Sequence, residues 1–483
     1  MKNKLFISIY CGLMILLASC NNYLDVKPKG KIIPETAEDF STIIHYWLDQ
    51  IEKGRDDVII PNPEVMTTLE MFADDLNATL ASNFGYTSIY VGSAINKNQA
   101  TYKTLYSVIK DCNMVIGNMD DTESDLARTL LGTAWSIRSI CYYNLMQRYC
   151  EPYQPETAKE TLGLPLVDDF DMEAKPARAN LKETAEFIEE GFRKALSYNV
   201  SNEDFIFTSS VTKAYFARFF FWTQNWSNAI TYAKEVLEKY PMLEADEYVE
   251  AINQKQAKAH NVIIRSFTMD DDIGTMSYAT AQADIKSRPV DRNLVDLFAA
   301  TDNDVRRRCN YDSKRIVNKI ITTKFRSEEL CLIIAEAHAH LNQETDALGY
   351  LNQLRSKRIT QDYIAYTIDN LPEVFQQNIK TDATGIPLTK LMSAILCERR
   401  KELFVEGDRW FELKRNGRPE FWVAANGSKY ETLKYFYTAP LPKEDIDFVV
   451  DKLKEIVGRP IGCNLEPVDL DADLMEERRV IST

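Results

Sequence analysis

An apolar stripe with helical spacing recurs along most of this chain of 483 residues. In 101–119, for example, Tyr102, Leu105 and Ile109 follow one another at steps of three or four residues. This spacing places side chains on one face of an α-helix, where they can be buried together. Comparable stripes predict helices over 101–119, 127–149, 181–197, 211–223, 227–239, 327–341, 345–358 and 389–406.

Runs typical of β-strands are few and short, and we expect them at Asn261–Phe267 and Tyr435–Leu441. The stretch 268–293 has no period and many turn-forming residues, which predicts a long loop. Loops of this length inside compact domains are often functional. The sequence therefore predicts a mostly α-helical protein with few short strands and long loops.

Two predicted helix pairs carry small residues where antiparallel helices of a tetratricopeptide unit cross. The first pair has Ala217 and Ala229 at these places, and the second has Ala335 and Ala347. Further matching positions are Phe220, Val236 and Pro241 in the first pair and His338, Leu351 and Leu354 in the second. Since Ala229 and Ala347 are 118 positions apart, we predict helix pairs embedded in one larger domain and not a regular solenoid.

The N-terminus has the three parts of an export signal. Two lysines precede the apolar run 5–17, which is shorter than the ~20 apolar residues of a spanning helix. Leu17-Ala-Ser-Cys20 then resembles the lipobox of bacterial lipoproteins. We predict a signal peptide over 1–19 and acyl chains on Cys20, with an ordinary secretory signal or an uncleaved anchor as the alternatives. The Pro- and Gly-containing segment 20–36 is predicted to be a lipidated tether.

The chain is acidic, with a formal net charge of -15. Such a surface repels phosphate backbones, so nucleic acid is not expected as a partner. Seven cysteines follow Cys20, and most lie in apolar helical stretches, where thiols pack as small hydrophobic groups. We predict buried thiols and no zinc site, while one disulfide stays possible.

The segment 397–415 combines alternating charges with a run of apolar and aromatic residues. Arg399 and Glu402 are three apart, as are Glu406 and Arg409, so each pair could form an ion pair on one helix face. Core residues are expected at Leu403, Phe404, Trp410, Phe411 and Leu413. We interpret the segment as a structural charge network rather than a catalytic site.

The segment Cys397-Glu-Arg-Arg-Lys-Glu-Leu-Phe-Val-Glu-Gly-Asp-Arg-Trp-Phe-Glu-Leu-Lys-Arg closely resembles the C-terminal signature of SusD/RagB outer-membrane lipoproteins of Bacteroidetes. Two departures from the family pattern are Thr133, where a glutamate is usual, and Lys443, where Asn-Pro is expected. Further segments that resemble the family in order are 23–30, 131–145, 163–167, 326–341 and 351–358.

The resemblance implies a SusD-like fold, a single large α-helical domain with tetratricopeptide-like helix pairs. Its N-terminal region with ligand loops would span 37–260, and its C-terminal region would span 261–483. The implied function is non-catalytic capture of a glycan at the cell surface, anchored in the outer membrane, and delivery to a SusC-like TonB-dependent transporter. A peptide ligand or a glycan-processing enzyme are the alternatives.

Family ligand residues lie in loops of the N-terminal half and in a mid-chain loop, which here correspond to 75–90 and 268–284. Aromatic faces stack on sugar rings, and Asn or Asp bonds sugar hydroxyls. The resemblance therefore points to six candidate ligand residues, namely Asp75, Asn77, Asn83, Tyr86, Tyr90 and Tyr278.

The sequence carries no HExxH, phosphate-binding loop or GxSxG motif. His338 and His340 are two residues apart on a predicted helix and so point to different faces, unlike a metal-binding pair. A glycosidase needs only two carboxylates, which leaves that alternative open. We expect no cofactor, with calcium binding left open.

Overall fold

We describe the protein from a computed structural model. Its described residues are 34–56, 58–76, 98–169, 176–254, 259–265, 272–298, 303–321, 323–425 and 428–442. The predicted signal peptide over 1–19 and most of the predicted tether over 20–36 lie outside them, and so does Cys20.

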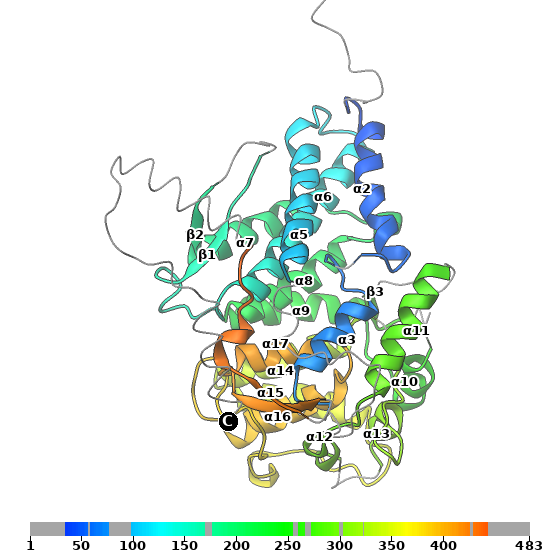
Figure 1. The fold of residues 1–483 in the computed structure, drawn as a ribbon, viewed down its shortest axis with the longest axis vertical. Coiled ribbons are helices and arrows are strands. Elements are labelled where there is room, and N and C mark those ends of the chain that lie inside the picture. The colour runs from blue at the N-terminus through cyan, green and yellow to red at the C-terminus, as the bar shows by residue number, and fades with distance from the viewer. Residues whose placement is uncertain are drawn as a thin grey trace, which may run out of the picture.

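Helices make up most of the described chain, which confirms the predicted mostly α-helical fold (Figure 1). All eight predicted helices correspond to observed helices, with ends that differ by at most four residues. The helices are α2 (Ala37–Glu52), α3 (Pro63–Phe72), α5 (Asn98–Asn118), α6 (Asp125–Tyr149), α7 (Leu181–Ser197), α8 (Ser209–Trp222), α9 (Trp226–Lys239), α10 (Ala245–Ile252), α11 (Asp272–Lys286), α12 (Arg292–Asp296), α13 (Val305–Asn310), α14 (Ser327–His340), α15 (Glu344–Ser356), α16 (Lys390–Glu402) and α17 (Asp408–Arg415).

The described strands form three two-stranded antiparallel sheets. The strand expected at Asn261–Phe267 is confirmed as β3 (Val262–Arg265), which pairs with β4 (Lys324–Arg326) about 60 residues later in the chain. The strand expected at Tyr435–Leu441 is wrong, because a 3-10 helix occupies Lys434–Tyr437 there. The pairs are β1 (Leu162–Pro165) with β2 (Arg178–Asn180), β3 (Val262–Arg265) with β4 (Lys324–Arg326), and β5 (Phe421–Ala425) with β6 (Ser428–Thr432).

α6 is the central helix of the upper layer in Figure 1, and it contacts α2, α5, α7 and α8. Ser124 caps its N-terminus by accepting a hydrogen bond from the backbone N–H of Ala127. Gly191 of α7 allows the close approach of the two helices, since a Cβ there would lie 2.3 Å from Oγ of Ser139. Thr133, at the departure from the family pattern, is fully buried in α6.

The two predicted tetratricopeptide-like pairs are helical hairpins, α8–α9 and α14–α15. Ala217, Ala229, Ala335 and Ala347 are all fully buried, as expected of residues at helix crossings. α14 also packs against α9, so the second hairpin continues the first in space although 87 residues (240–326) separate them. One core cluster accordingly joins side chains of α2, α5 to α9 and α14, and it includes residues of β3 and β4.

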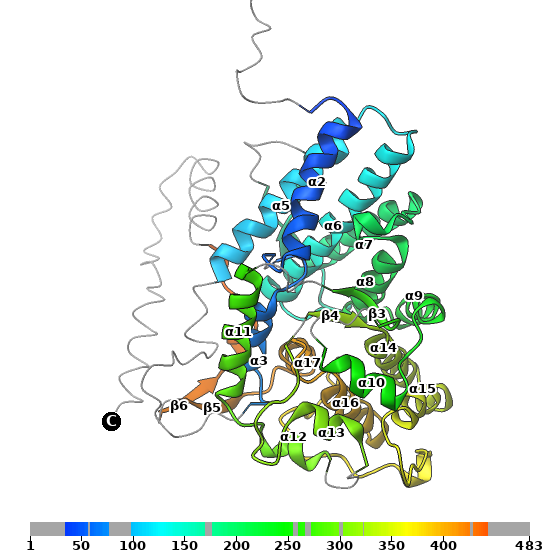
Figure 2. The same ribbon diagram turned by 90° about the vertical axis from the view of Figure 1, so that its right-hand side faces the viewer.

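α3 belongs to the N-terminal part of the chain but lies among C-terminal helices. Figures 1 and 2 show it beside α11, and it also contacts α17. The loop expected over 268–293 is wrong, because 272–286 forms α11. Tyr278, Ala281 and Ile285 of α11 are buried at helical spacing, a stripe that neighbouring turn-forming residues hide in the sequence.

Candidate functional site

The structure places the start of the 75–90 segment beside the residues that follow α11 in the chain. Leu76 and Val290 form an antiparallel bridge, and the backbone N–H of Asp291 donates to the carbonyl of Asp75 over 2.8 Å. The guanidinium of Arg288 donates to the carbonyl of Met71 over 3.2 Å. The base of the 75–90 segment and the α11 region are therefore neighbours.

The six candidate ligand residues have different outcomes. Asp75 is fully buried, and its Oδ1 accepts a hydrogen bond from Nε of Arg400 over 2.5 Å. The described structure thus places Asp75 in an interior ion pair, and a ligand contact there stays a prediction. The other candidates of this segment lie outside the described residues, namely Asn77, Asn83, Tyr86 and Tyr90.

Tyr278 lies on α11 and is 6% exposed, so its ring packs within the protein and does not present an open face. Its hydroxyl donates to Oε1 of Gln282 over 3.0 Å, and this oxygen also accepts from the backbone N–H of Ile321. Burial raises the pKa of Tyr278 to about 12, which keeps the hydroxyl protonated at neutral pH. A stacking role for this residue stays a prediction.

The signature segment 397–415 is a structural charge network, but its ion pairs differ from the expected ones. Arg399 pairs with Asp408 over 2.8 and 2.5 Å instead of with Glu402. α16 ends at Glu402, and Gly407 takes a left-handed conformation before α17 begins. The helix therefore breaks between Glu406 and Arg409, while Arg399 and Glu402 take other partners although both lie in α16.

Glu402 is instead surrounded by arginines from distant segments. Its carboxylate accepts hydrogen bonds from Arg326 and Arg358 over 3.0 Å each, and Arg306 lies 3.4 Å away. All four side chains are nearly or fully buried. Burial alone would raise the pKa of Glu402, but the three guanidinium groups hold it well below its usual range.

Asp74 and Asp75 join this network to the end of α3. Arg409 donates from Nε and Nη2 to the two carboxylate oxygens of Asp74 over 2.7 and 3.0 Å. The backbone N–H of Gly407 donates to Glu70 of α3 over 2.7 Å. The network therefore fixes α3 against α17 rather than presenting charges to a substrate. Sequence spacing could not reveal these partners, because they lie over 300 residues apart.

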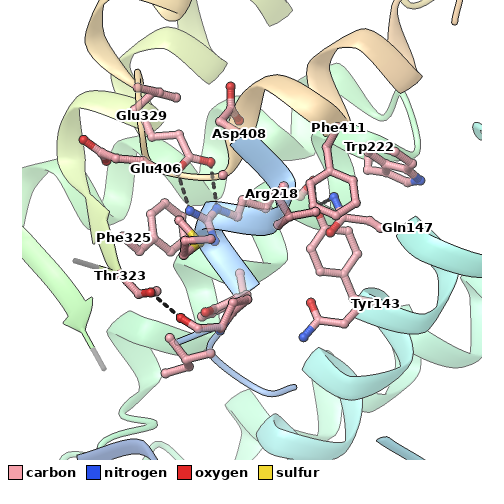
Figure 3. A pocket seen from close by; sticks show the side chains of 18 of the residues that line it. Tyr143, Gln147, Arg218, Trp222, Thr323, Phe325, Glu329, Glu406, Asp408 and Phe411 are labelled. Carbon is pink, nitrogen blue, oxygen red and sulfur yellow. Dashed lines mark hydrogen bonds and ion pairs between the residues drawn. The ribbon is translucent and has the colours of Figure 1, made fainter. Parts of the chain in front are cut away.

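A central cavity of about 120 Å³ lies where α6, α8, α14, β4 and the α16–α17 turn meet (Figure 3). Arg218 of α8 donates from Nε to Glu329 over 2.7 Å and from Nη2 to the other oxygen of the same carboxylate. Its guanidinium carbon lies 3.4 Å from the ring centre of Phe325. The cavity thus has a charged group held against an aromatic ring.

Aromatic side chains form another side of this cavity. Tyr143, Trp222 and Phe411 gather there in Figure 3, with Gln147 beside them. Gln147 donates from Nε2 to the Tyr143 hydroxyl over 2.7 Å. Sequence reasoning missed this cavity, since its residues come from separate segments of the chain. Some of them, such as Arg399 and Phe411, belong to the C-terminal signature, but that motif alone does not indicate a cavity.

His338, His340 and the cysteines of the described chain are packed residues, whereas His45 and His260 are exposed. His338 stacks on Tyr350 and His340 on Trp226, so the two rings face different neighbours, as expected. Cys397 is half-buried. The other described cysteines are buried free thiols, which confirms the packing prediction for Cys112, Cys141, Cys150, Cys309 and Cys331.

Within the described ranges, no group of three or more His, Cys, Asp or Glu side chains could hold a metal ion. None of the helices described above is both long and apolar enough to cross a bilayer.

Two family models together match most of the chain. One, described as the SusD family, matches residues 306–458, and the other, described as starch-binding and associating with the outer membrane, matches 22–221. The chain belongs to the SusD/RagB family. The resemblance seen in the sequence is thereby confirmed.

Solved structures share this SusD-like fold. A SusD superfamily protein of Bacteroides thetaiotaomicron has 17% sequence identity and a TM-score of 0.65, covering 85% of this chain and 98% of that one. A SusD-like carbohydrate-binding protein of Bacteroides vulgatus has 19% identity and a TM-score of 0.62, covering 86% and 96%. A laminarin-binding SusD-like protein has 16% identity and a TM-score of 0.53, covering 79% and 91%.

A SusD-like protein of Formosa agariphila is 34% identical over 94 residues. This match covers 20% of the present chain and 16% of that protein, so it spans about a sixth of the relative's length.

Proposed function

We propose that this protein captures a glycan at the outer membrane and delivers it, unaltered, to a SusC-like TonB-dependent transporter. The observation that carries the proposal is membership of the SusD/RagB family, combined with a fold shared with SusD-like proteins whose names state carbohydrate or laminarin binding. A lipid anchor on Cys20 would hold the protein at the membrane surface.

Non-catalytic binding is part of the proposal. Buried carboxylates of the charge network, such as Glu402 and Asp74, are engaged by arginines. A glycosidase would require a pair of carboxyl groups free to reach one glycosidic bond. We also propose that capture needs no cofactor, so that EDTA leaves the affinity unchanged.

The decisive experiment uses the mature protein from residue 20 onward with a panel of soluble polysaccharides in affinity gels. A reducing-sugar release assay runs on the same samples. Retardation by a glycan without sugar release supports the proposal. Retardation by none of the glycans, together with binding of a peptide library, favours the peptide alternative. Sugar release that is lost when a single carboxylate is changed would establish the enzyme alternative.

Single substitutions test the candidate ligand residues once a glycan is known. Tyr86→Ala and Tyr90→Ala are each expected to weaken binding by roughly 5- to 100-fold, since one stacked ring contributes about 1–3 kcal/mol. Tyr46→Ala is the matched control, because Tyr46 is a 56% exposed tyrosine on α2. Equal effects at all three positions would remove the 75–90 segment from the proposed site.

Delivery is tested separately from capture. Membranes are solubilised in a mild detergent, and the protein is purified by a tag at its C-terminus. A TonB-dependent barrel should copurify at a stoichiometric ratio. Its absence, with glycan binding intact, would retain the capture function and reject the transporter partnership.

A further inference from the structure

The central cavity carries a positive bias in an otherwise acidic protein. Its lining includes five arginine or lysine side chains against four carboxylates, whereas the whole chain has a net charge of -15. One of these carboxylates, Glu412, is fully buried, and burial raises its pKa to about 7. It therefore carries only part of its negative charge at neutral pH. A cavity of this kind favours an anion.

Arg218 is the cation best placed to meet such an anion. Its side chain retains 25% of its accessible surface, compared with 5% for Arg399 and Arg415 on the same lining. Nε and Nη2 are engaged by Glu329, and the Tyr215 hydroxyl also lies close to the Arg218 side chain, while no hydrogen bond from Nη1 is seen in the described part of the chain. Phe325 lies flat against the guanidinium and holds it in place. The Nη1 donors are thus preoriented.

The opposite requirement, an apolar surface for a ring, is met by the part-buried Phe411, because Tyr143 and Trp222 are each only 4% exposed. Trp222 and Phe411 stand edge to face with ring centres 6.4 Å apart. The amide of Gln147 lies on the same side and offers polar atoms next to these rings (Figure 3). Aromatic faces beside amide groups suit a sugar ring with its hydroxyl rim.

We propose that this cavity binds the carboxylate end of an acidic sugar, with the carboxylate on Nη1 of Arg218 and the sugar ring against Phe411. The inference rests on the proposed function, because it takes a saccharide to be the ligand. A volume of about 120 Å³ is small beside the roughly 300–1,000 Å³ of typical ligand pockets. The cavity therefore admits a carboxylate and adjoining ring atoms of one residue, while the rest of a glycan stays outside.

Two sources supply this chemistry, a free uronic acid and a uronic acid at the end of an oligosaccharide. Isothermal titration of the mature protein compares glucuronate, glucose, a disaccharide with a terminal glucuronate, and its neutral analogue. We expect each acidic ligand to bind at least 10-fold more tightly than its neutral counterpart, and the advantage to shrink with added salt. Tighter binding of the disaccharide than of glucuronate identifies the oligosaccharide as the source.

Variants assign the binding to the cavity. The double variant Arg218→Gln with Glu329→Gln removes both partners of the ion pair, so no buried charge is left alone. It should lose the preference for the acid, and Phe411→Ala should weaken acidic ligands without removing the preference. Arg193→Gln is the matched control, because Arg193 is an exposed arginine paired with Glu189 on α7. Thermal unfolding of each variant verifies that it is folded.

The outcomes separate this inference from the proposed function. Binding of neutral glycans with no preference for acids overturns the inference and leaves glycan capture in place. An acid preference that persists in the double variant also overturns it. Failure of every saccharide to bind overturns both.

Discussion

The carboxylate of Asp75 lies against the guanidinium of Arg400, which follows it by 325 residues, with Oδ1 2.5 Å from Nε. Both side chains are fully or almost fully buried. Arg409 pairs with the adjacent Asp74 in the same way. The end of α3 is thereby tied to both helices of the C-terminal signature, α16 and α17.

Removing one member of the Asp75–Arg400 pair should be strongly destabilising. Arg400→Met leaves a buried carboxylate without its partner, and we expect a loss of about 3–5 kcal/mol in the free energy of unfolding. Urea denaturation monitors the change. Arg193→Met, at an exposed ion pair, should cost less than about 1 kcal/mol. A loss at position 400 no larger than at position 193 would contradict the assigned role.

Glu402 should be even less tolerant of change, because three guanidinium groups converge on it. Glu402→Gln preserves the shape of the side chain but removes the charge that compensates the arginines. We expect a loss of at least about 3 kcal/mol in the free energy of unfolding. Glu186→Gln on the exposed face of α7 is the control. Differential scanning calorimetry on both proteins checks the prediction.

Glu70 should make stability depend on pH. Burial, and to a lesser extent Asp75, raises the pKa of Glu70 from about 4.5 to about 8. Between these values the unfolded chain has already released the proton, so the free energy of unfolding should fall as pH rises from 4.5 to 8. Glu70→Gln keeps an oxygen to accept from Gly407 but cannot ionise.

The variant should therefore be more stable than the natural protein at pH 8, by on the order of 3 kcal/mol. At pH 4.5 the two should be nearly equal. Urea unfolding at four pH values between these limits measures the difference. A constant difference across the range would show that Glu70 keeps the same charge in both states.

Gly407 should resist replacement for two reasons. Its φ is 74°, in the left-handed region, and an added Cβ would lie 2.8 Å from Sδ of Met66. We expect Gly407→Ala to lower the free energy of unfolding by about 2 kcal/mol, of which the backbone accounts for about 1 kcal/mol. Combining it with Met66→Ala should recover the steric part. The double-mutant cycle measures that coupling.

Cys20→Ala tests the lipid anchor. The substitution removes the sulfur to which acyl chains attach, and we expect the protein to move from the membrane fraction to the soluble fraction. Fractionation with immunoblotting measures the distribution. Cys11→Ala within the signal peptide is the control and should leave the membrane fraction unchanged. Continued membrane association of the Cys20 variant would reject lipidation.

The sequence predicted the helices well where one face is apolar and the opposite face polar. α7 was predicted with its observed ends, and the buried alanines correctly marked both hairpins. α11 was missed, because its short buried stripe lies among turn-forming residues. The C-terminal signature was correctly interpreted as structural, but both expected ion pairs were wrong. Val405 and Gly407 have positive φ and divide the predicted helix between Glu406 and Arg409, while Arg399 and Glu402, both in α16, take other partners.

The candidate site was only partly predictable. Leu76, in the first segment chosen by resemblance, bridges to Val290, which lies six residues beyond the end of the second segment, 268–284. The central cavity was not foreseen, since Arg218, Phe325 and Phe411 become neighbours only through tertiary packing. Local spacing carries no signal for such a set.

The packing of α14 on α9 sets an order of events during synthesis. Translation adds roughly 5–20 residues per second, so the 87 residues between the two helices take about 4–17 s to make. Throughout that interval the side of α9 that α14 will cover has no permanent neighbour. A chain that ended before Ser327 would keep this apolar strip uncovered, and chaperone binding should peak on nascent chains of that length.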